Sequence, residues 1–304
     1  MNICFYCRKS LSAVEDIFGY GLHENCFIKS FSLPIATEFQ GLLRMASDSY
    51  APPASAVEAS LFAGKFRKYL AHLNGQQYLL KVQDPKAPEL PAVEFLCNQL
   101  AQACGIEVPD FYLIRMRGLL TFVSHDFVKN DGAIIDLKHL THYLPLDGSY
   151  TCEVVMNIIL QETQRLVDGE SFVRLCLFDA LIGNRDRHAG NLAFIISSKG
   201  KRLAPVYDNT SMLGLEEEGK FLEADWRADG KIATALTAKP AAGDYVREFQ
   251  RLGKKDVMEA FFHRIPLEDC VHLIQHSFCG PYMKAAMERL LRKQYAEIQH
   301  ALAS

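Results

Sequence analysis

The polar segment from Gly183 to Asn191, GNRDRHAGN, holds the residues with the clearest chemical potential. Asp186 and Asn191 stand five positions apart within it, and Asp208 follows seventeen positions after Asn191. Protein kinases use an Asp to orient or deprotonate the attacking hydroxyl and an Asn five positions on to hold magnesium. A later Asp holds the metal ions at the nucleotide phosphates. Oxygen ligands of this kind suit magnesium rather than zinc.

Two residues upstream complete the order found in kinases. Lys81 stands in the apolar stretch QYLLKV, and Glu94 stands at the start of a helical pattern. We interpret them as a phosphate-anchoring ion pair. Two alternatives remain open: a surface lysine, and a carboxylate that favours a helix N-terminus. The chain has no GxGxxG ahead of Lys81, no His-Arg-Asp and no Asp-Phe-Gly, so it is not an ordinary eukaryotic-type kinase.

The elements expected to position these residues form two groups, strands with one helix up to residue 123 and mostly helices from about residue 137. Residues 63–70 and 77–82 read as strands joined by an Asn74-Gly75 turn, and a further strand pair is expected over 111–115 and 119–123. A helix is expected over 93–105. From about residue 137 the pattern becomes mostly helical, with helices expected over 152–166 and 170–182. The second of these is apolar almost all round and has Asp168 as its expected N-cap.

Composition limits the class of protein. The chain has 304 residues, 49% of them apolar, and a formal charge of −3, which suits a sizeable core and disfavours direct nucleic-acid binding. The sequence predicts neither a signal peptide nor a membrane span, because no apolar run approaches the ~20 residues needed. Nine cysteines, an odd number, favour a reducing compartment. We therefore expect a cytoplasmic protein.

Residues 1–30 stand apart from the rest. The steps Cys4-x2-Cys7 and His23-x2-Cys26 have the spacing of a small tetrahedral zinc knuckle. The alternative is a coincidence of cysteines and a histidine in a soluble protein. Residues 31–60 are punctuated by proline and rich in Ser and Ala, and we interpret them as a linker or mobile loop.

The sequence also resembles a known family. LIGNRDRHAGNLAFI followed by LAPVYDN is similar to the motif of the HipA family, bacterial toxin serine/threonine kinases. The similarity extends to YLLK (78–81), Glu94 and GIEVPDFYL (105–113), and covers about 65–295. It implies an α+β, two-lobed protein-kinase-like fold. The β-rich N-lobe would span 61–132 and the mainly helical C-lobe 133–304.

The resemblance implies roles by position. Asp186 would be the catalytic base, Asn191 and Asp208 would bind Mg2+, and Lys81 would contact the ATP phosphates with Glu94 steadying it. His188, Asn184 and the arginines of the segment would shape the loop. The remaining ATP-binding candidates lie near the hinge and in the phosphate-covering loop: Phe122, Asp126, Gly64 and Lys68.

Departures from the family pattern lie in the N-terminal part. Longer members carry an additional subdomain before the kinase core, whereas only residues 1–60 precede it here. The chain therefore resembles the short HipT toxins, whose missing subdomain can be a separate HipS-like protein. The family's phosphate-covering loop, with an autophosphorylated serine, is matched poorly by residues 55–69. Ser55 and Ser60 are the candidates for that serine.

The resemblance implies an ATP- and Mg-dependent serine/threonine protein kinase of the HipA toxin type. Its substrate would be a translation component such as an aminoacyl-tRNA synthetase, and its partner a HipB-like DNA-binding antitoxin. Delivery into a host cell stays open. Two other functions also stay open: a kinase acting on a lipid or small-molecule hydroxyl, and a non-catalytic zinc-bearing adaptor.

Overall fold

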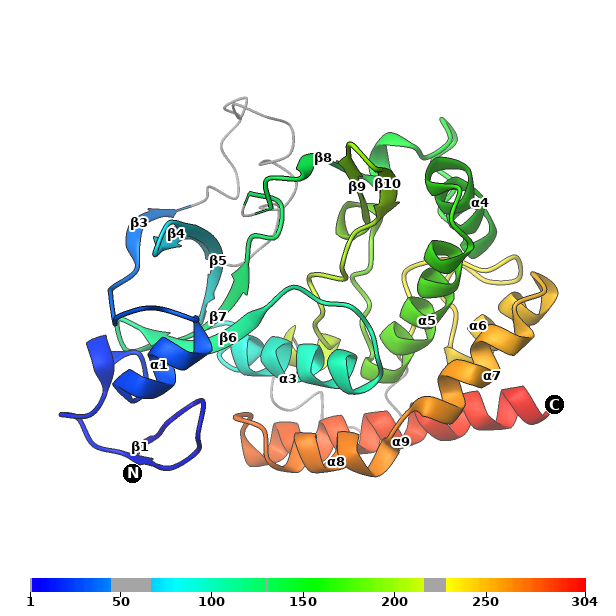
Figure 1. Ribbon diagram of the computed structural model, residues 1–304. Coiled ribbons are helices and arrows are strands. Elements are labelled where there is room, and N and C mark those ends of the chain that lie inside the picture. The colour runs from blue at the N-terminus through cyan, green and yellow to red at the C-terminus, as the bar shows by residue number, and fades with distance from the viewer. Residues whose placement is uncertain (1, 45–66, 130, 216–227) are drawn as a thin grey trace. The chain divides into compact units, whose positions relative to one another are not determined.

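The computed structural model describes residues 2–44, 67–129, 131–215 and 228–304 (Figure 1). The chain divides into two compact units, the first made of Met1–Phe95 and Pro109–Gly132, the second of Leu96–Val108 and Ala133–Ser304. Three of the candidate residues, Gly64, Ser55 and Ser60, lie outside the described residues.

An antiparallel five-stranded sheet forms the centre of the first unit, in the order β3-β4-β5-β7-β6. Its strands are β3 (Gln40–Arg44), β4 (Lys68–Leu73), β5 (Gln76–Val82), β6 (Phe111–Met116) and β7 (Leu119–His125). Two-residue turns join β4 to β5 and β6 to β7. Asn74-Gly75 and Arg117-Gly118 have positive φ throughout, as the twist of a tight hairpin requires.

Helix α3 (Leu90–Ala103) begins three residues earlier than the sequence pattern predicted. Glu94 therefore lies beyond the first turn of the helix. A favourable interaction with the helix N-terminus no longer explains the residue, because that effect is confined to the first turn. The ion pair remains as its explanation.

The N-terminal module, residues 2–30, packs against the sheet within the same unit. It consists of β1 (Asn2–Ile3), β2 (Ser10–Leu11), a short 3-10 turn (Ile17–Gly19) and α1 (Glu24–Ser30). The N–H of Arg115 in β6 donates to the carbonyl of Tyr20 at 2.8 Å. The Arg115 guanidinium also lies 4.9 Å from the centroid of the Phe5 ring in the module, and the ring of Phe31, which directly follows the module, lies 4.1 Å from that of Tyr112 in β6.

The interpretation of residues 31–60 as a linker or mobile loop is wrong for residues 31–44. Phe31, Leu33 and Phe39 are buried, and β3 pairs with β4. The prolines and serines of this segment indicate turns. Its aromatic residues nevertheless pack into the hydrophobic core, and burial of their apolar surface determines the structure. Residues 45–60 lie outside the described residues.

The second unit combines a small sheet with a group of helices. The sheet has the order β10-β9-β8, from β8 (Ile134–His139), β9 (Ala193–Ser197) and β10 (Gly200–Leu203). The helices are α4 (Cys152–Thr163), α5 (Leu166–Ile182), α6 (Ala242–Arg251), α7 (Lys255–Arg264), α8 (Leu267–Gln275) and α9 (Pro281–Ala303). Short 3-10 turns occupy Leu140–His142, Ala189–Asn191 and Met212–Leu215.

Helix α5 is the central helix of this unit, as expected for a helix that is apolar on almost all sides. It contacts α4, α6, α7 and α9. It begins at Leu166, ahead of the expected start, so Asp168 lies inside the helix rather than at its N-cap. The Asp168 carboxylate instead accepts the N–H of Leu203 at 3.1 Å and ties α5 to β10.

Among the described helices, none is long and apolar enough to cross a membrane. All nine cysteines are free thiols.

Candidate functional site

The polar segment begins where α5 stops. Gly183 ends the helix in the left-handed conformation, with φ of 66°, which glycine adopts at little cost. A Cβ at this position would lie 2.9 Å from Cδ2 of Leu290 in α9. The N–H of Asn184 donates to the carbonyl of Asp179 at 2.8 Å and closes the helix end. The segment therefore leaves a rigid, buried helix in one fixed direction.

Arg187 is the centre of the hydrogen-bond network, with 1% of its surface exposed. Its guanidinium donates to both carboxylate oxygens of Asp179, at 2.8 and 3.0 Å. It also donates to the carbonyl of Tyr207 and to Oδ1 of Asn209, both at 2.6 Å, and to the carbonyl of Asn191 at 3.3 Å. One side chain thus joins α5, the polar segment and the segment around Asp208.

Burial alone would lower the pKa of Arg187, but the carboxylate of Asp179 outweighs it and raises that pKa. The pair is thus a buried charged pair with a full set of hydrogen bonds, and it needs both partners. The sequence predicts only loop support for the arginines. The signal that could have revealed more was Asp179, a carboxylate within the otherwise apolar stretch Leu175–Ile182.

The backbone around Asp186 is held on both sides. Its N–H donates to Oδ1 of Asn184 at 2.9 Å, and its carbonyl accepts from the Asn191 side-chain amide at 2.9 Å. The carbonyl also accepts from the N–H of His188 at 2.7 Å. The Asp186 side chain itself is exposed. This arrangement fixes the chain and leaves the carboxylate accessible to a reactant.

The proposed metal ligands occupy different environments. Asn191 is 6% exposed, and its amide nitrogen is used by Asp186, so its Oδ1 is the atom left for a cation. Asp208 is half-buried and has a φ of 52°, a conformation that Asp tolerates better than most residues. The β9–β10 hairpin returns the chain so that Tyr207 and Asn191 share Arg187. This brings the backbone of Asp208 close to the polar segment.

Sequence reasoning missed a second support, made by His139 and Tyr207. His139 is 1% exposed, and its Nδ1 lies 2.7 Å from the carbonyl of Gly190, next to Asn191. The Tyr207 hydroxyl donates to the same carbonyl at 3.2 Å. Burial lowers the pKa of His139, which favours the neutral ring. A lone histidine at a strand end gave no signal of this role.

The first unit contains the expected lysine–glutamate pair. Lys81 in β5 and Glu94 in α3 are 7% and 2% exposed, and the ammonium donates directly to the carboxylate. The Lys81 ammonium lies 5.7 Å from the ring centroid of Phe122, which faces it on β7. Lys68, in register with Lys81 on β4, is also buried. The interpretation of Lys81 as a surface lysine is therefore wrong.

Asp126 follows β7, and its carboxylate is engaged by the chain around it. It accepts the N–H groups of Val128 and Lys129 at 3.1 and 3.0 Å, and the side-chain amide of Gln77 at 3.1 Å. Burial raises its pKa despite these bonds. The residue shapes the segment that leaves the sheet.

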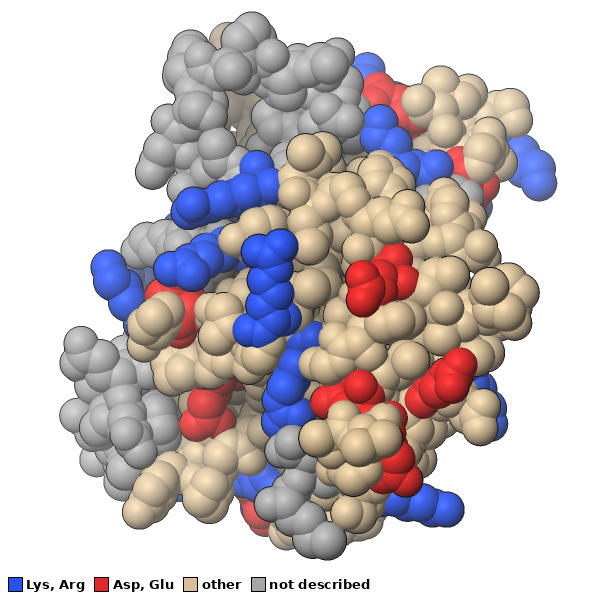
Figure 2. All heavy atoms as spheres, turned by 90° about the vertical axis from the view of Figure 1, so that its left-hand side faces the viewer, with Lys and Arg blue, Asp and Glu red and all other residues tan. Residues whose placement is uncertain are grey.

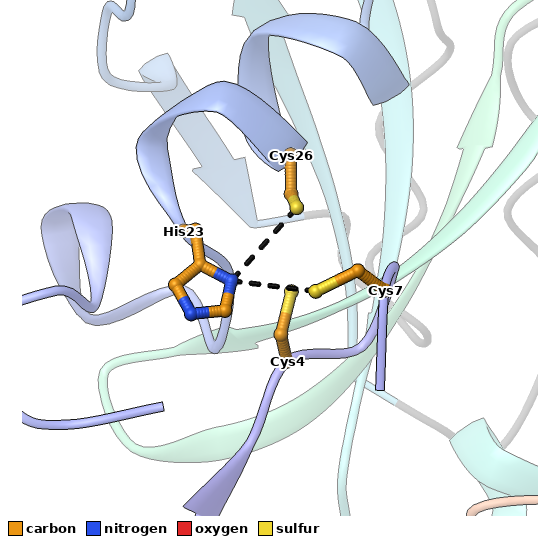
Figure 3. Close-up of side chains that lie close together, drawn as sticks. All are labelled: Cys4, Cys7, His23 and Cys26. Carbon is orange, nitrogen blue, oxygen red and sulfur yellow. Dashed lines mark hydrogen bonds between the residues drawn. The ribbon is translucent and has the colours of Figure 1, made fainter. Parts of the chain in front are cut away.

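Cys4, Cys7, His23 and Cys26 converge in the N-terminal module (Figure 3). Their ligand atoms all lie within 4.8 Å of one another. Nδ1 of His23 lies 3.5 Å from the Cys7 sulfur and 3.8 Å from the Cys26 sulfur. Nε2 of the same ring lies 3.1 Å from the carbonyl of Ser10, and a bond there leaves Nδ1 unprotonated for a cation. Three sulfurs and one nitrogen fit a tetrahedral zinc ion.

The thiols of this cluster differ in acidity. Burial raises the pKa of Cys4, but hydrogen bonds with the backbone of Cys7, His23 and Tyr6 outweigh it and bring the pKa to about 7. For Cys26, burial and the neighbouring thiols Cys7 and Cys4 raise the pKa to about 12. Close-packed sulfurs of this kind need a cation before all of them can ionise.

Comparison with known proteins identifies the family. The family described as the HipA-like C-terminal domain matches residues 57–265. This chain belongs to that HipA-like family. The resemblance inferred from LIGNRDRHAGNLAFI is thereby confirmed.

Solved structures confirm the fold class. The proinflammatory kinase CtkA of Helicobacter pylori is 16% identical, with a TM-score of 0.65 over 79% of this chain and 91% of that chain. HipA of Shewanella oneidensis MR-1, solved with HipB and operator DNA, is 13% identical. Its TM-score is 0.53 over 92% of this chain and 71% of that chain. The chain thus has a HipA-like, kinase-like fold, and a kinase-like function in general is supported.

Proposed function

We propose that this protein is an ATP- and Mg-dependent serine/threonine protein kinase of the HipA toxin type. The observation that carries the proposal is the Arg187 network. It fixes Asp186, Asn191 and the chain at Asp208 as one preorganised group within a rigid unit. Preorganisation of charge and position is what phosphoryl transfer requires of a protein, because little covalent chemistry is left for it to do.

Each residue has a stated role. The accessible Asp186 carboxylate accepts the proton of the attacking hydroxyl. Oδ1 of Asn191 and the carboxylate of Asp208 would hold Mg2+, which would supply positive charge to neutralise the phosphates. Lys81, steadied by Glu94, binds the ATP phosphates. Four further residues are proposed to contact ATP: Lys68, Gly64, Phe122 and Asp126.

The test is the Asp186→Asn variant with γ-labelled ATP and a protein acceptor. We expect a loss of at least about 100-fold in phosphotransfer, the usual range for a general base, with an unchanged melting temperature. Asp256→Asn, an exposed Asp in the first turn of α7, is the matched control and should retain full activity. Wild-type turnover by Asp186→Asn would remove the assignment. Label on a lipid or small molecule instead of serine would change the acceptor class.

The resemblance to the HipA family supports proposals for substrate and partners. We propose a translation component, such as an aminoacyl-tRNA synthetase, as substrate, with Ser55 or Ser60 as sites of autophosphorylation. A HipB-like antitoxin is the proposed partner, and the Shewanella structure of HipA with HipB and operator DNA supports it. A separate HipS-like protein is the further proposed partner, since the chain resembles the short HipT toxins. Phosphopeptide mapping after incubation with ATP tests the autophosphorylation sites.

The cysteine–histidine cluster is proposed to hold structural zinc. All four ligands come from the protein, which leaves no open coordination position for chemistry. The ion would stabilise a module that is too short to fold around its own core.

A further inference from the structure

A cavity of about 330 Å3 lies inside the first unit, where the N-terminal module meets β6. Its walls are largely aromatic. Phe5 and Tyr6 come from the module, Phe95 from α3, and Phe111 and Tyr112 from β6. Binding cavities in proteins begin at about 300 Å3 and are lined in this way. The volume and lining suit an aromatic side chain.

Strand β6 is the last strand of the sheet, so one of its edges faces away from β7. The N–H of Arg115 points to that edge, because it donates to Tyr20 rather than to β7. Main-chain groups alternate along an antiparallel strand, so those of Leu113 and Phe111 point the same way. Within the described residues, no main-chain partner pairs with the N–H of either.

Phe111 and Leu113, whose N–H groups point to this edge, also help to line the cavity. Leu113 is only 3% exposed, so bulk water does not solvate it freely. Unpaired main-chain groups at a sheet edge are a template for another strand. The cavity therefore offers an aromatic subsite directly beside a place for an extended backbone.

Lys29, which is exposed, is the charged side chain among the residues that line the cavity. The Arg115 guanidinium lies 4.9 Å from the centroid of the Phe5 ring, and its buried Nη1 has no hydrogen-bond partner among the described residues. Figure 2 views the molecule from the side on which Figure 1 draws the module, and both basic and acidic side chains lie on this face. An Asp or Glu of a bound segment would complement Lys29.

We propose that this cavity docks an extended segment of a partner protein. The segment pairs its main chain with β6 at Phe111 and Leu113, inserts one aromatic side chain, and places Asp or Glu beside Lys29. Phe95 directly follows Glu94 in α3, so the inserted ring touches the helix that holds Lys81. Binding itself does not depend on the proposed kinase activity, and a binding experiment tests it separately.

The probe is a fluorescein-labelled eight-residue peptide of alternating Thr and Val around one Phe that is flanked by two Glu. Fluorescence anisotropy on the full-length protein should show saturable binding. A peptide with Ala for Phe should bind at least about tenfold more weakly, which is ~1.4 kcal/mol. Lys29→Glu should weaken binding of the Glu-flanked peptide and strengthen binding of a peptide with Lys in place of both Glu residues. Lys199→Glu, an exposed lysine outside the cavity lining, is the matched control and should bind as wild type.

A second measurement reports the main-chain pairing. Hydrogen exchange of the Phe111 and Leu113 amides should slow on binding of the peptide. Equal binding of the Phe and Ala peptides, unchanged exchange, or no saturable binding would overturn the proposal. Binding of 3-phenylpropanoate with no gain from the peptide would assign the cavity to small aromatic acids and also overturn it. So would self-association that Lys29→Glu abolishes, since the occupant would then be a second copy.

Discussion

At the scale of single residues, Arg187 has the largest consequence. It lies buried against Asp179 and anchors two segments at once. Arg187→Met should destabilise the protein by about 3–5 kcal/mol, because the Asp179 carboxylate would be left buried without its counterion. Urea unfolding followed by circular dichroism measures the change.

The matched control for this substitution is Arg292→Met. Arg292 also pairs with carboxylates, those of Glu268 and Glu288, but it is exposed, and its loss should change the midpoint little. Adding Asp179→Asn to Arg187→Met should recover part of the lost stability, because the unpaired charge is removed. If Arg187→Met unfolds at the wild-type midpoint, the network does not hold the site.

A side chain at Gly183 would destabilise the helix end in two ways, through backbone strain and through a steric contact. Gly183→Ala should destabilise the second unit through the positive φ, about 1–2 kcal/mol, and through the contact with Leu290. Gly148→Ala is the control, since Gly148 has a φ of 69° and nothing within 4 Å of an added Cβ. The difference between their unfolding free energies isolates the contact. Equal unfolding free energies would show that α9 accommodates the added methyl group without a loss of stability.

At the scale of elements, the N-terminal module and the sheet share one core. Removal of zinc should therefore lower the melting temperature of the first unit as a whole, rather than release residues 1–30 alone. Metal analysis should give one zinc per chain, and Cys7→Ser or Cys26→Ser should lose it. Cys97→Ser, a buried thiol outside the cluster, should retain it. A chain with full stability and no zinc would contradict the assignment.

Zinc binding should release protons, because thiols bind the ion as thiolates. Near pH 8 Cys4, with its pKa of about 7, is already largely ionised, whereas Cys26, with its pKa of about 12, is not. The affinity of the cluster for zinc should therefore rise as the pH increases between these two pKa values. Zinc titrations in two buffers of different ionisation enthalpy measure the protons released. No release at pH 8 would show that a different ligand set holds the ion.

At the scale of the whole molecule, the sequence predicted the fold better than the support of the site. The Asn74-Gly75 turn and helix α5 could be predicted because their signals, a turn dipeptide and apolar residues on almost all sides of a helix, are local in the sequence. Asp186, Asn191 and Asp208 stood at a spacing that a known chemistry requires. His139 acts through a contact with Gly190, 51 positions away, and no local pattern encodes that contact. For Arg187 the local signal is Asp179, but its bonds to Tyr207 and Asn209 join segments about 20 positions apart. Phe31 and Phe39 were misread for the same reason, since their partners lie on distant strands.

Lys81 is proposed to bind the ATP phosphates, and Asp208 is proposed to bind the Mg2+ that accompanies ATP. A ligand that binds only the folded state stabilises it by mass action, about 2.7 kcal/mol at a hundredfold excess over Kd. ATP with Mg2+ should therefore raise the melting temperature of the wild type. Lys81→Met and Asp208→Asn should each abolish that shift, whereas Lys199→Met should keep it. A full shift in Lys81→Met would mean that nucleotide binding does not need Lys81, and the role proposed for the Lys81–Glu94 pair would be wrong.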